Sequence, residues 1–146
     1  RYNATSRGKV MQAVNDSRKA VRKIEAETGR EIKDDLTFLD VAFVLGYPEC
    51  SYCGKYVPED ERTLDHITPM RYGGDNTFSN VTMACRSCNS SKGDYPALSY
   101  LHKKYGIQQL VDRIACREQI SYDDAYMILV EHAVNYFEKQ MEDKKR

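Results

Sequence analysis

Apolar residues follow a helical period at both ends of the chain, and the middle of the chain has a different pattern. Over residues 5–27 they recur mostly every three or four positions, which is typical of a helix with one buried face. We expect Thr5 or Ser6 to cap this helix and Gly29 to end it. The apolar positions are Val10, Met11, Val14, Val21 and Ile24.

A second helix is expected over residues 34–45, with Asp34 or Asp35 near its start. Most of its positions are apolar, so it is a candidate for a core helix against which the central part of the chain packs. Gly46-Tyr47-Pro48 ends it, because proline cannot continue a helix. Its apolar members are Leu36, Phe38, Leu39, Val41, Ala42, Val44 and Leu45.

Three more helices are expected near the C-terminus, over residues 97–105, over residues 107–117, and from Ser121 onward. Ser121 is a favourable cap for the last and longest of them, and acidic residues in its first turn suit the positive end of the helix dipole. One face of this long helix is apolar at every third or fourth position and is expected to point inward. The positions are Tyr122, Tyr126, Leu129, Ala133 and Phe137.

Four of the five cysteines form two Cys-x-x-Cys pairs, which bracket the middle of the chain. The pairs are Cys50 with Cys53 and Cys85 with Cys88, and thirty-one residues separate them. Four thiolates spaced in this way suit a tetrahedral Zn²⁺ ion, and a four-sulfur site has no open position, so the zinc would be structural. Two disulfides or four buried thiols are the alternatives. The fifth cysteine, Cys116, lies in an apolar-periodic segment and is predicted to be a buried thiol.

The segment that follows the first cysteine pair has the pattern of two short strands and a helix. Apolar residues flank a polar pair at residues 64–67, as at the end of a strand. A turn with Gly73-Gly74 follows, and residues 80–83 predict a returning strand. Residues 86–92 then predict a short helix. The expected order is strand, loop, strand and helix, tied at the base by the cysteines.

In this order and spacing, residues 50–94 resemble the HNH endonuclease family, the zinc-containing branch of the His-Me finger (ββα-metal) nucleases. The likeness implies an α+β fold in which a small zinc-clamped ββα-metal module is surrounded by N- and C-terminal helices. The third letter of the family name, usually histidine, falls here on Asn89, as in His-Asn-Asn variants. The matching residues are the cysteine pairs, Leu64-Asp65-His66-Ile67, Pro69, Gly73-Gly74, Asn80, Arg86-Ser87, Asn89 and Lys92.

The resemblance also implies a role for each polar residue of the module. His66 is the expected general base, and Asp65 with Asn89 is expected to hold one Mg²⁺ or Mn²⁺ ion. Asn80 is expected to orient His66 through its side chain or to position its loop. The implied function is a metal-dependent endonuclease that hydrolyses DNA phosphodiester bonds and nicks one strand per module. Taken singly, each of these residues could instead end a strand, form a turn or begin a helix.

The charge of the chain is balanced overall and uneven along its length. The 22 basic and 22 acidic residues give a formal net charge of zero, whereas tight non-specific nucleic-acid binders prefer a basic surface. Residues 1–23, however, hold seven basic residues and one acidic residue. This asymmetry indicates either a basic arm that meets phosphate or a solvated helix face. The predicted nucleic-acid contacts are Arg18, Lys19, Arg22, Lys23, Arg71, Arg86 and Lys92.

The expected organisation is a basic helical region at 1–46 that packs on the module, a nuclease module at 47–94 and a helical region at 95–146. Double-stranded DNA is the expected partner, with a homodimer or a larger assembly as a further expectation. No apolar run approaches the roughly 20 residues of a membrane span. Cysteines with metal spacing favour a reducing, cytoplasmic compartment. The alternative functions are a non-catalytic zinc-ribbon module that binds nucleic acid and a structural zinc domain that recruits a protein.

Overall fold

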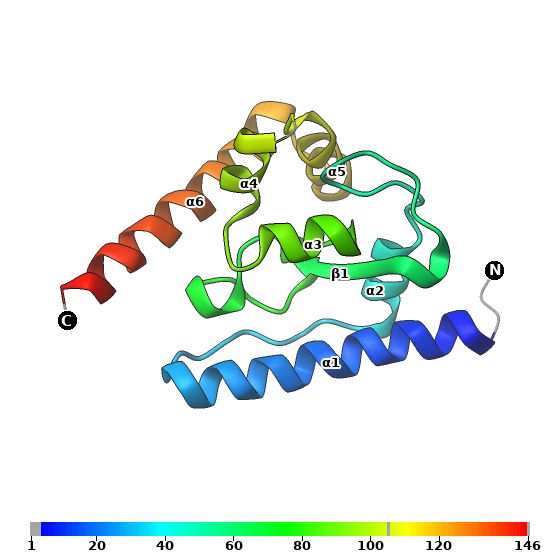
Figure 1. Cartoon of the computed structure of the whole chain (residues 1–146), viewed down its shortest axis with the longest axis horizontal. Helices are drawn as coiled ribbons and strands as arrows, with labels where there is room; N and C mark the ends of the chain where they lie inside the picture. The colour runs from blue at the N-terminus through cyan, green and yellow to red at the C-terminus, as the bar shows by residue number, and fades with distance from the viewer. Residues whose placement is uncertain (1–3, 105, 146) are drawn as a thin grey trace.

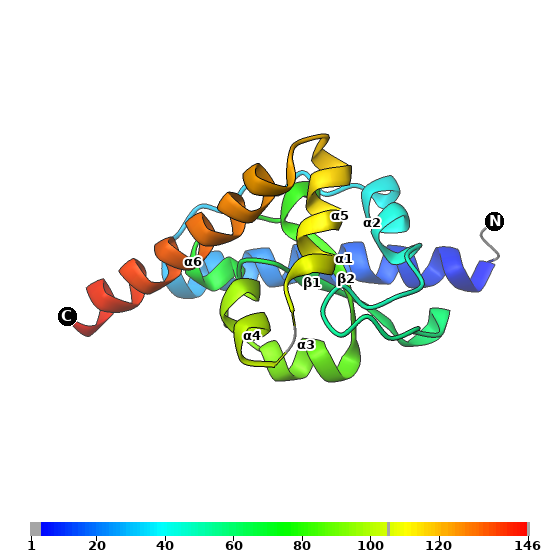
Figure 2. The ribbon, with the colours of Figure 1, turned by 90° about the horizontal axis from the view of Figure 1, so that it is seen from above.

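A computed structural model describes residues 4–104 and 106–145, with side chains over 6–101 and 106–145. Two antiparallel strands and a short helix form its centre. Helix α1 (Ala4–Thr28) lies along one side of this centre, and α4 (Ala97–Lys104), α5 (Gln108–Glu118) and α6 (Tyr122–Lys144) lie on the opposite side (Figure 1). The C-terminal part of α6 extends beyond the rest of the molecule, as the view from above also shows (Figure 2).

Helix α1 spans Ala4–Thr28 and buries one face, formed by Val10, Val14, Ser17 and Val21. The helix already includes Thr5 and Ser6, so the predicted capping role of either residue is wrong. Gly29 follows the helix with a positive φ of 73°, as expected for a residue that ends it.

Helix α2 spans Phe38–Leu45, so it begins four residues later than residue 34, where the sequence placed its start. Thr37 caps it instead, because its hydroxyl accepts from the backbone N–H of Asp40 while the Asp40 carboxylate accepts from the N–H of Thr37. This reciprocal pair satisfies two donors that the helix itself leaves free. Asp34 lies before the cap and contacts another segment of the chain, Asn76.

The central module contains the strand, loop, strand and helix that the pattern predicted. Strand β1 (Arg62–His66) pairs antiparallel with β2 (Val81–Cys85), with His66 opposite Val81. Helix α3 (Arg86–Lys92) begins directly after β2 and is capped by the Cys85 side chain. Three short 3₁₀ turns complete the module: η1 (Glu59–Glu61), η2 (Met70–Tyr72) and η3 (Phe78–Asn80). The predicted α+β architecture is therefore confirmed.

Three C-terminal helices also occur where the sequence predicts them: α4 (Ala97–Lys104), α5 (Gln108–Glu118) and α6 (Tyr122–Lys144). Ser121 caps α6 as expected, because its hydroxyl accepts from the N–H of Asp124 at 3.1 Å. Four residues of α6 are buried, at intervals of four, four and three positions. The predicted apolar face is therefore wrong at its first and last positions. The buried residues are Ala125, Leu129, Ala133 and Tyr136, whereas Tyr122 and Phe137 are exposed.

The thiol of Cys116 is exposed, so its predicted burial is also wrong. The buried face of α5 is formed by Leu110, Val111 and Ile114. Cys116 lies two residues beyond Ile114, and each residue turns an α-helix by about 100°, so its side chain points to the opposite side. Apolar periodicity therefore predicted the helix correctly, but it assigned Cys116 to the wrong face of that helix.

One hydrophobic core joins the module to the helices on both sides of it. Val14 of α1, Val44 of α2, Met83 of β2, Leu101 of α4 and Leu129 of α6 all belong to one buried cluster. The core therefore links the module to α1 and α2 and to the C-terminal helices α4 and α6. Among the described helices, none combines the length and the apolar character that crossing a membrane requires.

Candidate functional site

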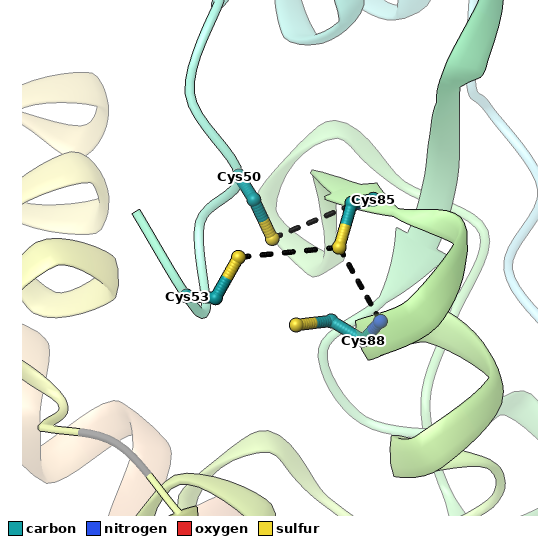
Figure 3. Close-up of side chains that lie close together, drawn as sticks. All are labelled: Cys50, Cys53, Cys85 and Cys88. Atoms are coloured by element: carbon teal, nitrogen blue, oxygen red, sulfur yellow. Dashed lines mark hydrogen bonds between the residues drawn. The ribbon is translucent and has the colours of Figure 1, made fainter. Parts of the chain in front are cut away.

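The four paired cysteines converge at one end of the two strands, as Figure 3 shows. Their sulfur atoms all lie within 4.8 Å of one another, and the Sγ atoms of Cys53 and Cys85 are 4.0 Å apart. Sulfurs about 2.3 Å from a tetrahedral zinc ion lie about 3.8 Å from one another, so the cluster fits zinc. All the cysteines are free, which argues against the alternative of two disulfides. The cluster could thus hold the predicted structural metal.

Backbone N–H groups surround the cluster and favour thiolates. The Cys50 sulfur accepts from the N–H groups of Tyr52 and Cys85, and the Cys85 sulfur accepts from the N–H of Cys88, each at 3.4 Å. Burial has the opposite effect, and with a contribution from the Cys50 thiolate it raises the pKa of Cys53 and of Cys88. Thiolates crowded in this way repel one another, and a cation at their centre offsets that repulsion.

Asp65, His66 and Asn89 line one hollow of about 370 Å³ at the end of β1. Asp65 and His66 are the last two residues of the strand, and Asn89 faces them from α3. The fourth predicted catalytic residue, Asn80, is buried behind the neighbouring loop. Further lining residues include Pro69, Met70, Arg71 and Lys92.

The Asp65 carboxylate is buried and has two partners on the same oxygen. Its Oδ2 atom accepts from the Tyr52 hydroxyl and forms an ion pair with Lys92, whose Nζ lies 3.3 Å away. Burial raises the pKa of Tyr52 well above its usual range, and the Asp65 charge adds to this effect, so the phenol keeps its proton. The Oδ1 atom of Asp65 accepts no hydrogen bond from the described residues.

Lys92 is only 1% exposed, which removes it from the predicted nucleic-acid contacts. Its ammonium group lies beneath α3, where it pairs with Asp65 and donates to the backbone carbonyl of His66 at 2.8 Å. A buried ammonium group needs such partners, because desolvation of an unpaired charge is costly. Lys92 therefore ties α3 to the end of β1 and does not reach the surface.

His66 is half-buried, and its imidazole meets a side chain that the sequence prediction did not include. The ring Nε2 atom lies 2.9 Å from the Oδ1 atom of Asn76. Burial lowers the pKa of His66, although the hydrogen bond to Asn76 and the charge of Asp65 oppose this effect. The imidazole is therefore neutral near pH 7, as a proton-accepting group must be.

Asn80 holds the loop between the strands. Its Oδ1 accepts from the N–H of Thr68, and its Nδ2 donates to the carbonyls of Thr68 and Asp75, each at 2.9 Å. Gly74 lies against this clamp, where a Cβ atom would come within 2.0 Å of the Thr68 carbonyl oxygen. Of the two roles expected for Asn80, these contacts match loop positioning.

Asn89 lines the hollow, and the two ends of its amide differ in their hydrogen-bond partners. Its Nδ2 donates to the Thr63 hydroxyl at 3.0 Å. Its Oδ1 has no hydrogen-bond partner in the described part of the chain. Carboxylate and amide oxygens are ligands that Mg²⁺ prefers, so the uncommitted oxygens of Asp65 and Asn89 fit a divalent ion.

A second hollow of about 490 Å³ adjoins the first and is also lined by His66. It lies between α1 and β1, and its cationic side chains are Lys9, Arg62 and Arg86. Burial and the Arg86 charge lower the pKa of Lys9, which reflects crowding of positive charge there. The exposed basic residues of α1 that the sequence analysis singled out line neither hollow. They are Arg18, Lys19, Arg22 and Lys23.

Three residues at the site escaped the sequence prediction. Tyr52 lies inside a Cys-x-x-Cys pair, and Asn76 was interpreted only as turn chemistry. Lys9 contributed to the basic N-terminal count without being selected as a contact. No spacing rule links these residues to Asp65 or His66, because their contacts form only in the folded chain. The half-buried Tyr72, beside the Gly73-Gly74 turn, packs on Tyr136 with ring centroids 5.0 Å apart.

Comparison with known families and proteins gives consistent matches. The model of the HNH endonuclease family matches residues 50–98. The CRISPR-associated endonuclease Cas9 of Actinomyces naeslundii is 30% identical over 108 residues, which cover 68% of this chain and 10% of that protein. The Cas9 of Corynebacterium diphtheriae is 39% identical over 49 residues, covering 33% of this chain and 4% of that protein. The chain thus spans a tenth or less of these curated relatives.

A search of solved structures found a match that covers most of this chain. It is the crystal structure of the Type II-C Cas9 enzyme from Actinomyces naeslundii, which matches with a TM-score of 0.45 and 26% sequence identity. The alignment covers 86% of this chain and 14% of that chain.

Proposed function

Since this chain belongs to the HNH endonuclease family, we propose that it is a metal-dependent endonuclease that hydrolyses DNA phosphodiester bonds. The observation that carries the proposal is that Asp65, His66 and Asn89 line one hollow. A neutral imidazole and two oxygen ligands for a divalent ion therefore border the same space. This arrangement supports the roles that the family resemblance implied for them.

In the proposed reaction, His66 takes a proton from the water that attacks the phosphorus. Burial keeps the imidazole neutral and so ready to accept that proton. Lys92 holds the strand end in place through the His66 carbonyl. Asn80 fixes the following loop, whose backbone it clamps at Thr68. The proton acceptor is thus positioned by rigid neighbours, which general-base catalysis requires.

Asp65 and Asn89 would hold one Mg²⁺ or Mn²⁺ ion through their uncommitted oxygens. Such an ion supplies positive charge that stabilises the phosphate and the leaving oxygen. The Tyr52 hydroxyl and the Lys92 ammonium group share the other Asp65 oxygen, so they orient the carboxylate. One module contains one such site, which supports nicking of a single strand.

Zn²⁺ is the metal that we propose for the four-cysteine cluster, because a closed sulfur site suits zinc. The cluster joins the loop at Cys50 and Cys53 to the start of α3, and so fixes the helix that carries Asn89. A reducing, cytoplasmic setting stays a prediction, which rests on the metal-type spacing of the cysteines.

We infer that a DNA strand lies across the two hollows, because His66 lines both of them. Arg86 and Lys9 border one hollow, and Arg71 borders the other, although Arg71 already pairs with Glu27 at 2.7 Å. A phosphate would compete with that exposed carboxylate. The basic residues on the outer side of α1 would add long-range attraction rather than direct contact with the cleaved strand.

This chain matches only a tenth or less of its curated relatives, which are much longer proteins. The double-stranded substrate and the state of assembly therefore stay predictions. Double-stranded DNA is the substrate that the resemblance implies. A homodimer or a larger assembly stays a prediction, as does the division of the chain at residues 46 and 94. A second module would be needed to cut both strands in one binding event.

A supercoiled-plasmid assay with Mg²⁺, with Mn²⁺ and with EDTA tests the proposal. We expect metal-dependent conversion to open circles, and we expect His66→Ala to lower the rate by about 10²–10⁴-fold, the usual contribution of a general base. Thermal melting and zinc content of the variant should match those of the parent protein, since His66 lies outside the core.

Full activity of His66→Ala would show that another group accepts the proton. Absence of cleavage by a folded, zinc-loaded parent protein would favour the non-catalytic zinc-ribbon module instead. A gel-shift titration against salt would then separate nucleic-acid binding from a purely structural role, because only the former weakens as salt rises.

A further inference from the structure

We propose that Asn76 is a positioning residue that fixes the tautomer of His66, so that Nδ1 is the atom that accepts the proton. Asn76 belongs to the loop before β2, and its side chain is fully buried. It joins His66 to two residues of the N-terminal segment, Ser17 and Asp34. The inference rests on the proposed role of His66 as general base. It adds which ring nitrogen accepts the proton and which residues select that nitrogen.

The neighbours of Asn76 fix the orientation of its amide. Its Nδ2 atom lies 2.8 Å from the Asp34 carboxylate and 3.0 Å from the Ser17 hydroxyl. A carboxylate only accepts hydrogen bonds, so the amide atom beside it must be the NH₂ group. The Ser17 hydroxyl donates its own hydrogen to the Val14 carbonyl at 2.7 Å, which leaves it an acceptor toward Asn76. Both contacts select the same amide orientation.

This orientation leaves Oδ1 of Asn76 facing the imidazole, 2.9 Å from Nε2. An amide oxygen only accepts, so Nε2 of His66 must carry the hydrogen. In a neutral imidazole the other nitrogen, Nδ1, then has the free electron pair. The Asp34 carboxylate thus selects the proton-accepting atom of His66 through one intervening amide.

The backbone around Asn76 is held as firmly as its side chain. Its N–H donates to the Lys33 carbonyl at 2.9 Å, and its carbonyl accepts from the N–H of Asp35 at 3.2 Å. Arg30 secures the same loop through the carbonyls of Met70 and Gly74. The segment after α1 therefore lies beside the loop in a fixed register, and the N-terminal region becomes part of the catalytic arrangement.

Nitrogen NMR of the intact, uniformly ¹⁵N-labelled protein tests the tautomer without any variant. The chain has three histidines, so assigning the His66 ring through His66→Ala is straightforward. At about pH 8, above the ordinary histidine pKa of about 6.5, we expect the ring signals of the Nε2–H form. Signals of the Nδ1–H form would overturn the proposal, even if the protein cleaves DNA.

Asn76→Ala tests the consequence for the reaction. We expect kcat for plasmid nicking to fall about 10- to 100-fold, the usual effect of removing a residue that orients a catalytic group, with KM unchanged. The ring signals of His66 should become a mixture of the two tautomers. Asn15→Ala is the matched control, because Asn15 is exposed on α1. We expect it to change neither readout.

Asp34→Asn keeps the proposal testable if Asn76→Ala does not fold. Asp34 is exposed, so this substitution leaves the core intact. An amide at position 34 no longer dictates which atom of Asn76 faces it, so we expect a smaller fall in kcat and a partial mixture of tautomers. If neither variant alters the ring signals, Asn76 does not set the tautomer. If the parent protein shows the Nε2–H form but no cleavage, the positioning holds and the proposed nuclease function fails.

Discussion

The cysteine cluster and the hollow at His66 lie at opposite ends of β1 and differ in how they are built. In the cluster, all four candidate ligands come from two short motifs, and their sulfurs converge within 4.8 Å. In the hollow, Asp65 and His66 take their partners from Tyr52, Asn76 and Lys92, which lie 10 to 27 positions away. The cluster is closed, and its ligands belong to two motifs that can be recognised in the sequence. The hollow is open, and the partners of Asp65 and His66 belong to no common motif.

The cluster serves the stability of the module, whereas the hollow serves the proposed chemistry. A four-sulfur site has no position for substrate, so its metal can only hold the fold together. The hollow instead leaves an oxygen of Asp65 and one of Asn89 uncommitted and keeps the His66 imidazole neutral. Damage to the cluster should therefore unfold the module, whereas replacement of His66, which lies outside the core, should remove activity and leave the fold in place.

The largest effect is expected from Cys88→Ser. Structural zinc contributes about 10–16 kcal/mol of apparent binding energy in small zinc peptides. This is comparable to the roughly 5–15 kcal/mol stability of a typical domain, so we expect loss of bound zinc and unfolding of the module. Circular dichroism with a zinc assay measures both. Cys116→Ser is the matched control, because Cys116 is exposed and outside the cluster. A folded, zinc-free Cys88→Ser protein would contradict the structural role.

Lys92→Met should produce the next largest effect, because it leaves the buried Asp65 carboxylate without its cation. Breaking a buried ion pair from one side costs about 3–5 kcal/mol, which urea denaturation would detect. Lys33→Met makes the same change in an exposed pair with Asp35, where we expect less than about 1 kcal/mol. Unchanged stability with weakened DNA binding would restore the surface role that the sequence suggested for Lys92.

Lys92 also shows where prediction from the sequence ends. Spacing and periodicity were enough for the helices, the two strands and the four cysteines, because those features depend on neighbouring residues. The direction of the Lys92 side chain depends on its contact with Asp65, which lies 27 positions earlier in the chain. No local sequence pattern indicates that contact. The same limit explains the errors at Cys116, two positions beyond the buried Ile114, and at Phe137, one position beyond the buried Tyr136. Asn76 was missed because its contacts with His66, Ser17 and Asp34 form only in the folded chain.

Gly74→Ala tests the loop between β1 and β2, which lies at the His66 end of the strands. A Cβ atom there would lie 2.0 Å from the Thr68 carbonyl oxygen and 2.7 Å from the Asn80 amide nitrogen. The backbone must shift, so we expect a loss of about 1–3 kcal/mol in a thermal melt, with reduced cleavage. Gly8→Ala is the control, since nothing lies within 4 Å and alanine favours the helix by up to about 1 kcal/mol. Equal melting temperatures for both variants would show that the loop tolerates the shift.

The smallest effect distinguishes two surfaces for DNA. Arg86 lines the hollow beside His66, whereas Lys19 lies on the exposed side of α1 and lines neither hollow. Each phosphate contact contributes about 0.9 to the slope of log binding constant against log salt. We would measure fluorescence anisotropy of labelled duplex DNA across a salt series, in the His66→Ala background. We expect Arg86→Gln to lower the slope by about 0.9 and Lys19→Gln to lower it much less, because Lys19 would contribute only long-range attraction. The reverse result would move the DNA to the outer face of α1, away from His66, and such a position could not serve cleavage at the hollow.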